Sequence, residues 1–269
     1  MPETLILANS KDGRNKSADG SAFDVIFDVP IRTGKDTHLK VLSSTIWYTF
    51  PNVKTGVNDQ LVIKYGNGLT NTAYLTIPQG LYGITELDAA VQHQIESLGL
   101  SSQSNLASKT ALVIGANYAT GQASVTINID TSQPTQHVEI DWVNSSLAPL
   151  LGFTQNVSLN AASGDFTAAF FGNTIASLSP VDSLQIHCST ARGSVVAGKT
   201  DSDVIASIQI DARPGFQIMY NPVQAPRVSA PGFAFTNGVR IMRMRLTDQE
   251  GVAVNTQSEY WTATLLLEW

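Results

Sequence analysis

Apolar and polar residues alternate with a period of two along much of the chain. In the segment 23–29 every second residue is Phe or Val, and Asp24 and Asp28 lie between them. The segments ASVTINID (123–130) and HVEIDW (137–142) repeat this alternation, which is typical of half-buried β-strands. The same criterion predicts further strands over residues 38–50, 60–66, 72–78, 111–115, 183–190, 203–211, 215–220, 239–247 and 260–268.

Gly, Pro, Asn and Asp separate these short strands. Such spacing is typical of an antiparallel β-sandwich, whereas a parallel βαβ protein needs helical segments between its strands. The sequence therefore predicts an all-β fold. Residues 1–21 are polar and rich in turn residues, and we expect them to form an N-terminal arm.

Two segments depart from the alternation. Residues 84–98 carry Leu87, Val91 and Ile95 at helical spacing, with Thr85 as the expected N-cap and Gly99 as the stop. The segment SSLAPLLGF (145–153) predicts one helical turn that ends at Gly152. Its apolar residues are expected to cover the core and are also candidates for a partner interface, namely Leu147, Leu150, Leu151 and Phe153.

Only 14% of the 269 residues are charged, against roughly 25% in an ordinary soluble domain. The formal net charge is −6 and the hydrophobic content is 43%. This combination excludes an intrinsically disordered chain and disfavours direct nucleic-acid binding, because no overall positive field is present. A subunit enclosed by neighbours explains the low charge, since interface cores are depleted in charged residues.

The sequence does not predict a metal site, an intrachain disulfide or a membrane span. Cys188 is the single cysteine, and the four histidines show no metal-binding spacing. No stretch approaches the ~20 apolar residues of a membrane span. The first twenty residues lack the pattern of a signal peptide, so we expect an intracellular site of synthesis and no cofactor or metal.

The segment GSVVAGKT (193–200) matches the phosphate-binding pattern G-x-x-x-x-G-K-[ST]. Such a loop must be followed by a helix whose N-terminal amides face the phosphates, whereas Ile208 and Ile210 alternate with polar residues as in a strand. We therefore interpret GSVVAGKT as a hairpin loop and a chance match.

Charged residues cluster on a few predicted strands. The acidic pairs Asp24/Asp28, Glu139/Asp141 and Asp201/Asp203 are most simply explained as solvated strand faces. Arg243 and Arg245 share one face of the strand 239–247. This face is either solvated, paired with acids, or an interface to another subunit or to nucleic acid.

Three blocks taken together resemble a known family. They are LTIPQGLYGITELDAAVQHQI (75–95), VEIDWVNSSLAPLLGF (138–153) and RIMRMRLTDQEGVAVN (240–255) followed by the last strand WTATLLLEW (261–269). Their order resembles the penton (minor capsid) jelly-roll proteins of Polinton/Maverick-type elements and adenovirus-like double-stranded DNA viruses. The resemblance runs from about residue 22 to the C-terminus.

The resemblance implies an eight-stranded antiparallel jelly roll over residues 22–269, with 84–151 as an inserted segment of one amphipathic helix and a hairpin. It further implies a structural, non-enzymatic protein of the virion. Such a protein forms homopentamers at the capsid vertices beside a double-jelly-roll major capsid protein, and a spike or an internal capsid protein is a further expected partner.

Two other functions stay open at this level. The chain could be a trimeric major capsid or spike subunit, although two jelly rolls need about sixteen strands. It could also be a carbohydrate-binding sandwich that stacks sugars on Trp47, Tyr82 or Trp142. An ATPase would depend on Lys199, within the pattern rejected above.

Overall fold

The computed structural model describes residues 2–34, 36–100, 112–130, 135–178, 181–192, 194–196, 199–234 and 238–269. The chain forms two compact units. Unit 1 comprises Met1–Phe50 and Val181–Trp269, and unit 2 is the intervening segment Pro51–Pro180.

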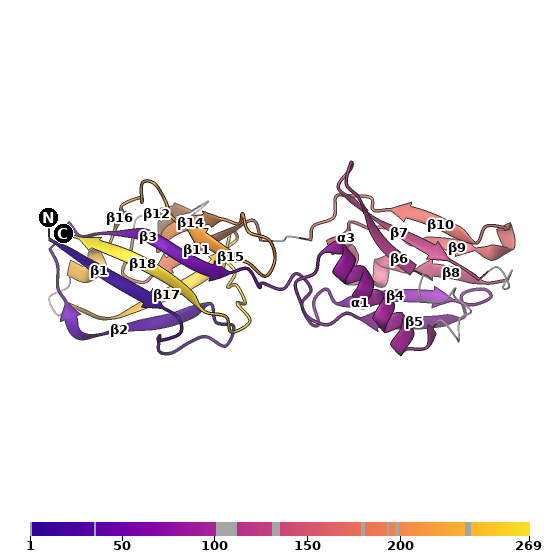
Figure 1. The fold of residues 1–269 in the computed structure, drawn as a ribbon, viewed down its shortest axis with the longest axis horizontal. Coiled ribbons are helices and arrows are strands. Elements are labelled where there is room, and N and C mark those ends of the chain that lie inside the picture. The colour runs from indigo at the N-terminus through magenta and orange to yellow at the C-terminus, as the bar shows by residue number, and fades with distance from the viewer. Residues whose placement is uncertain are drawn as a thin grey trace. The chain divides into compact units, whose positions relative to one another are not determined.

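Unit 1 is a sandwich of two antiparallel sheets, drawn in Figure 1 with its strands labelled. The first sheet follows the order β1-β18-β3-β15, with the short β16 also paired to β3. Its strands are β1 (Glu3–Asn9), β18 (Trp261–Glu268), β3 (His38–Trp47), β15 (Gln217–Tyr220) and β16 (Val228–Ser229). The second sheet follows the order β14-β11-β17-β2. Its strands are β14 (Val204–Gln209), β11 (Ser183–Cys188), β17 (Val239–Asp248) and β2 (Ala22–Ile31).

This order identifies the topology. Counted along unit 1, the first sheet holds the first, eighth, third and sixth of these main strands, and the second sheet holds the fifth, fourth, seventh and second. Two sheets that exchange consecutive strands in this way form a jelly roll. The fold class predicted from the sequence is therefore confirmed as a jelly-roll β-sandwich.

The alternation seen in the sequence creates the core between these sheets. Each strand turns every second side chain inward, so that Phe23 meets Trp261 edge to face at 4.9 Å between ring centres. The indole of Trp261 also donates a hydrogen bond to the carbonyl of Gly20 at 3.2 Å. A buried tryptophan that satisfies its N–H in this way ties the loop before β2 to the core.

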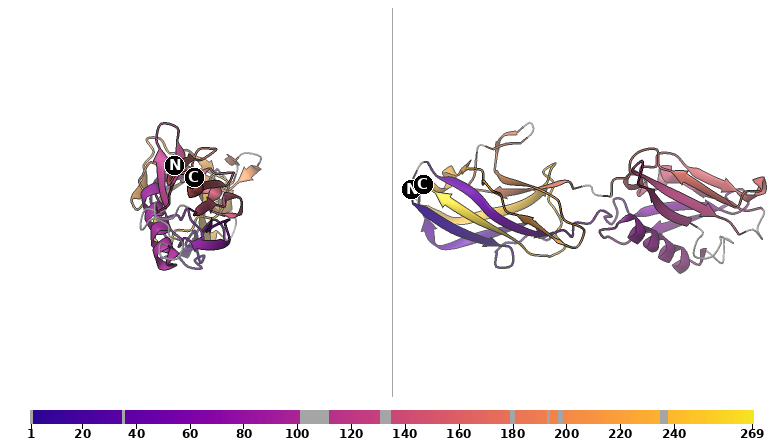
Figure 2. Two further views of the ribbon diagram at one scale, coloured as in Figure 1. Left: turned by 90° about the vertical axis from the view of Figure 1, so that its right-hand side faces the viewer. Right: turned by 45° about the horizontal axis from the view of Figure 1, so that its top comes forward.

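The prediction of a polar arm over residues 1–21 is wrong for Glu3–Asn9. This segment is strand β1, which pairs antiparallel with β18 from Glu3 opposite Glu268 to Asn9 opposite Thr262. Its inward residues Ile6 and Ala8 are buried. The pairing brings the two ends of the chain side by side, as Figures 1 and 2 show.

Unit 2 has its own two sheets and its own core. One sheet has the order β5-β4-β8-β9 and the other the order β10-β7-β6. The strands are β4 (Gln60–Tyr65), β5 (Asn71–Thr76), β6 (Leu112–Asn117), β7 (Gln122–Asn128), β8 (His137–Ile140), β9 (Val157–Asn160) and β10 (Thr167–Phe171). The inserted segment is therefore larger than the predicted 84–151, because β4 and β5 before the helix and β9 and β10 after it belong to the same core.

The helix α1 (Ile84–Ser97) buries Leu87, Val91 and Ile95 in this core, as its spacing predicts. It also covers the edge of β6, where the Asp88 carboxylate accepts a hydrogen bond from the Ile114 amide at 2.7 Å. A covered edge cannot pair with another chain. The predicted N-cap is wrong, because the N-cap residue is Gly83 and no side chain caps the helix.

The remaining helical pieces are single turns. They are η1 (Trp142–Asn144), α3 (Ala148–Leu151), η2 (Ala161–Ser163) and η3 (Pro231–Ala234). The turn predicted within 145–153 is confirmed as α3, and it ends at Gly152 with φ at 75°. Among the described residues, no helix is long and apolar enough to span a membrane.

Candidate interaction surfaces

The apolar residues predicted around α3 are not on a surface. Leu147, Leu150, Leu151 and Phe153 are all buried in the core of unit 2. Phe153 stacks on Trp142 with 4.4 Å between ring centres and 6° between ring planes. Because this segment fills the core, its role as a partner interface is wrong, and its role as a core cover holds.

Arg243 and Arg245 project from β17 on the outer face of the second sheet of unit 1, where both are exposed. Arg243 lies 3.2 Å from the Asp24 carboxylate on β2, and Arg245 lies 3.5 Å from the Asp203 carboxylate. Of the readings open from the sequence, the structure therefore favours an acid-paired face. Both guanidinium groups are exposed, whereas the Asp24 carboxylate is buried, so the pair with Arg243 offsets the burial of a charged group.

A buried polar cluster lies next to Arg245. His187 on β11 places its Nδ1 2.7 Å from Asp203 and its Nε2 2.9 Å from the Thr247 hydroxyl. No sequence pattern predicts this cluster, because its members lie on three separate segments. The cluster thus places a hydroxyl, an imidazole and a carboxylate in series, as in a catalytic triad. Thr247 is only 1% exposed and its hydroxyl donates to the Asp248 carbonyl, so a substrate has no path to it and we treat the cluster as structural.

The acidic pair Glu139/Asp141 meets a single lysine. Lys64 Nζ lies 2.7 Å from Asp141 and 3.5 Å from Glu139. Burial by itself would raise the pKa of Asp141, but hydrogen bonds from Lys64 and Asn144 outweigh burial and hold that pKa below its ordinary value. A carboxylate kept ionised in this way is a structural anchor, since a general acid needs a raised pKa.

The segment around GSVVAGKT forms a hairpin. Strand β12 (Ser194–Val196) pairs antiparallel with β13 (Lys199–Ser202), and Gly193, Ala197 and Gly198 lie outside the described residues. A strand therefore occupies the place where a phosphate-binding loop has its helix, as the sequence analysis expects.

The single cysteine lies in the interior of unit 1. Cys188 is buried, and burial raises the pKa of its thiol, which keeps the thiol in its protonated form. Within the part of the chain that the structure describes, no group of three or more His, Cys, Asp or Glu residues is arranged to hold a metal ion.

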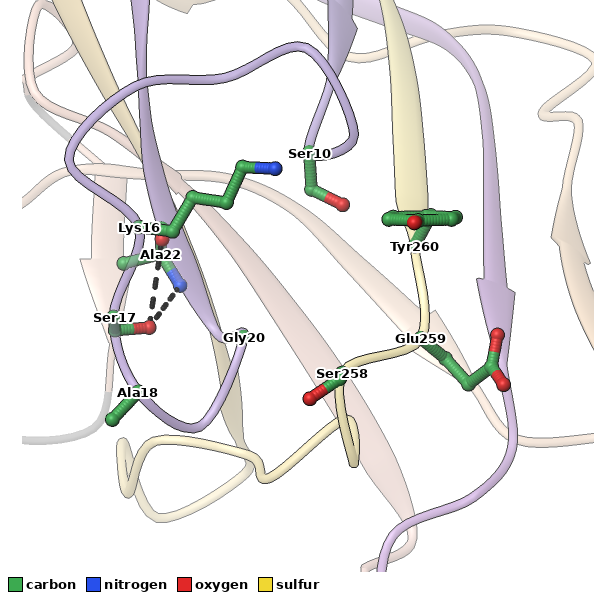
Figure 3. Close-up of a pocket in the computed structure, with 9 residues that line it drawn as sticks. All are labelled: Ser10, Lys16, Ser17, Ala18, Gly20, Ala22, Ser258, Glu259 and Tyr260. Carbon is green, nitrogen blue, oxygen red and sulfur yellow. Dashed lines mark hydrogen bonds between the residues drawn. The ribbon is translucent and has the colours of Figure 1, made fainter.

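A pocket of about 240 Å³ lies between the 10–22 loop and the start of β18. In Figure 3 the side chain of Lys16 extends toward Ser10, and the ring of Tyr260 lies on the opposite side of the pocket. The Lys16 ammonium already donates to the Lys11 carbonyl at 2.7 Å, and Lys11 lies 5.8 Å from the ring centre of Tyr260. These contacts hold the loop against the start of β18.

The outer face of the first sheet of unit 1 differs from that of the second. The cross-strand pairs place Asn9, Thr262, Thr45 and Met219 in one row across the sheet, and Leu7, Thr264 and Ser43 in the next. Neither row contains a charge. Leu5, Leu7 and Met219 are 56%, 71% and 66% exposed. The row that contains Leu5 continues through Leu266 to Lys40, and Lys40 pairs with Glu268. The two charge-free rows, with Leu7 and Met219 exposed, have the composition of a protein interface. The run of apolar residues at 5–8 was a signal for it that the arm interpretation overlooked.

Comparison with known proteins gives one informative result. No protein-family model and no curated protein matches the sequence. A solved structure does match, the crystal structure of the mavirus penton protein, with a TM-score of 0.51 and 10% sequence identity. The match covers 100% of this chain and 99% of that chain. Along its whole length, the chain therefore shares the fold of a viral penton protein.

Proposed function

We propose that this protein is a structural, non-enzymatic capsid protein, the penton subunit at the vertices of a double-stranded DNA virus. The observation that carries the proposal is the likeness to the mavirus penton protein over the entire chain, jelly roll and inserted unit together. A likeness that covers both units is more specific than a shared jelly roll, because jelly rolls serve many unrelated functions.

In this role the subunit forms a homopentamer and lies beside a double-jelly-roll major capsid protein in the virion. Exposed apolar residues on the outer face of the first sheet support assembly, because Leu5, Leu7 and Met219 are better covered by protein than by water. A spike or an internal capsid protein is a further partner that the role admits.

The mass of the native assembly tests the proposal. One copy has a mass of 28.8 kDa, so native mass spectrometry of the purified protein should give a particle of five copies, and negative-stain micrographs should show rings. Particles of three copies would support the trimeric alternative. A protein that stays monomeric at all concentrations, and that fails to associate with the major capsid protein, would contradict the proposal.

The two alternatives from the sequence gain less support. A double-jelly-roll subunit needs a second jelly roll, whereas the sheets of unit 2 have the orders β5-β4-β8-β9 and β10-β7-β6. Of the three aromatic residues considered for sugar stacking, Trp142 is buried against Phe153, and Trp47 and Tyr82 are partly buried.

A further inference from the structure

The first sheet of unit 1 ends in two open edges. In the described part of the chain no strand pairs with the outer edge of β1 or of β15. Open edges readily associate with other chains unless charges, proline or a covering element prevents it. Here the side chains beside both edges are apolar, namely Leu5 and Leu7 on β1 and Phe216 and Met219 at β15, with Phe216 63% exposed.

These two apolar patches lie on opposite edges of the same sheet, in different rows. Met219 belongs to the row with Thr45, Thr262 and the groove residue Asn9, and Leu7 belongs to the neighbouring outward-facing row with Thr264 and Ser43. The patches are therefore two different surfaces of one subunit. Contact between two such surfaces on successive copies is heterologous and produces a closed ring when the rotation between copies allows closure.

The β1 patch opens into a groove between β1 and β2, with a volume of about 440 Å³. Its apolar walls are Leu7, Val25 and Ile26, and its charged residues are Asp12, Arg14, Asp24 and Asp28. Asp24 is paired with Arg243, whereas Asp12 and Asp28 form no ion pair with the described residues. Asp12 accepts only a hydrogen bond from the Asn9 amide at 3.1 Å. The groove therefore has an acidic excess.

The β15 patch combines exposed apolar residues with one arginine. Arg213, Phe216 and Met219 line one hollow of about 500 Å³ together with Asp211, Ala212 and Gln217. Arg213 is exposed and forms no ion pair with any described residue, Asp211 included. An exposed aromatic residue beside an unpaired arginine is the composition that binding hot spots favour.

We propose that the β15 patch of one copy docks into the β1–β2 groove of the next copy. Phe216 and Met219 then cover Leu7 and Ile26, and the Arg213 guanidinium faces the Asp12 carboxylate. The inference rests on the proposed function, because it names the two surfaces that close the oligomer proposed there.

A charge-reversal cycle tests this contact. The full-length variants Arg213→Glu, Asp12→Arg and the double variant are compared with the wild type by native mass spectrometry and sedimentation over a range of concentrations. Glu250→Arg, an exposed acid in the turn after β17, is the matched control. Each single reversal should raise the concentration needed for assembly by about tenfold or more, because like charges then face each other. The double variant should return to within about threefold of the wild type, and the control should not change.

The outcomes separate this inference from the proposed function. If the wild type assembles and the single variants assemble equally well, or the double variant shows the sum of the single effects, the named contact is overturned and the capsid role stands. If the wild type itself never assembles, both fail. Circular dichroism of each variant verifies that the exposed substitutions leave the fold intact.

Discussion

The carboxylate of Asp141 is buried at the start of η1, where Lys64 and Asn144 hold it ionised. Because its pKa is lowered in the folded protein, its contribution to stability is present above the ordinary Asp value of about 4 and is lost as the pH falls through the lowered folded value. We expect Asp141→Asn to lower the free energy of unfolding by about 1–3 kcal/mol at pH 7.

The pH dependence of that loss is the decisive readout. The difference between Asp141→Asn and the wild type should shrink as the pH falls below about 4. The carboxylate of the unfolded chain becomes protonated first, and the folded carboxylate follows at its lowered pKa. Urea unfolding at pH 7, 5 and 3 measures it, as long as the protein remains folded at pH 3. A difference that stays constant across this range would contradict the ionised anchor.

Gly152 shows how one backbone conformation fixes the end of α3. Its φ is 75°, and a Cβ placed there would lie 2.4 Å from the Thr174 carbonyl oxygen. We expect Gly152→Ala to destabilise unit 2 by about 2 kcal/mol or more, from left-handed strain and from displacement of the Thr174 backbone.

Gly164→Ala is the matched control for this substitution. Gly164 also has a positive φ, 90°, but no atom lies within 4 Å of the added Cβ. Thermal unfolding of the two variants separates strain from collision. Equal losses would show that the contact with Thr174 contributes nothing.

At the scale of elements, Asn52 joins the two ends of unit 2. Its side-chain amide donates to the carbonyls of Tyr82 and Leu178, both at 2.7 Å, and its oxygen accepts from the Tyr82 amide at 2.9 Å. Asn52 is 1% exposed. The first and last segments of the unit are thereby held together away from water.

Substitution of Asn52 by Ala should therefore be costly. We expect a loss of about 2–4 kcal/mol, because three backbone groups that bond the buried Asn52 side chain lose their partner at once. Hydrogen exchange should show the larger effect in the segments that contain Tyr82 and Leu178. Asn173→Ala removes one exposed hydrogen bond to the Thr154 amide and should cost under about 1.5 kcal/mol. A comparable effect of both substitutions would argue against the role of Asn52.

At the scale of the whole molecule, the few charged residues are unevenly distributed between the two units. Unit 2 contains only three of the 16 Lys and Arg residues and eight of the 22 Asp and Glu residues, so it carries most of the net charge of −6. Unit 1 contains the larger share of the charges. Arg243 and Arg245 of its second sheet are paired to acids, and Lys40 of its first sheet is paired to Glu268. The low proportion of charged residues in the chain is therefore mainly a property of unit 2.

Unit 2 should fold when it is produced alone. Its core cluster contains residues of unit 2 only, and Asn52 holds its ends together. We expect the fragment 51–180 to unfold cooperatively on heating, as circular dichroism would record. The shorter fragment 84–151 lacks β4, β5, β9 and β10 and should stay unfolded. A folded 84–151 fragment, or an unfolded 51–180 fragment, would contradict this division of the chain.

The sequence by itself determined most of the strands, the helix α1, the turn at α3 and the hairpin around GSVVAGKT, but it missed the strands β1, β9 and β10. These elements follow from local periodicity and from residues such as Gly152, whose effect does not depend on distant parts of the chain. Local periodicity does not determine which strands are neighbours. For this reason the predicted boundaries of the inserted segment are too narrow, and residues 1–21 are predicted to form an arm although they contain β1.

Only the tertiary structure decided which surfaces remain exposed. Leu147 and Leu7 are equally apolar in the sequence, yet Leu147 is buried beneath unit-2 strands and Leu7 lies beside an open sheet edge. Likewise, Arg243 forms an ion pair and Arg213 forms none with the described residues. The sequence does not predict this difference, because the partner of Arg243 lies on a strand more than 200 residues away along the chain. Burial and pairing depend on strand order, which is a property of the whole fold.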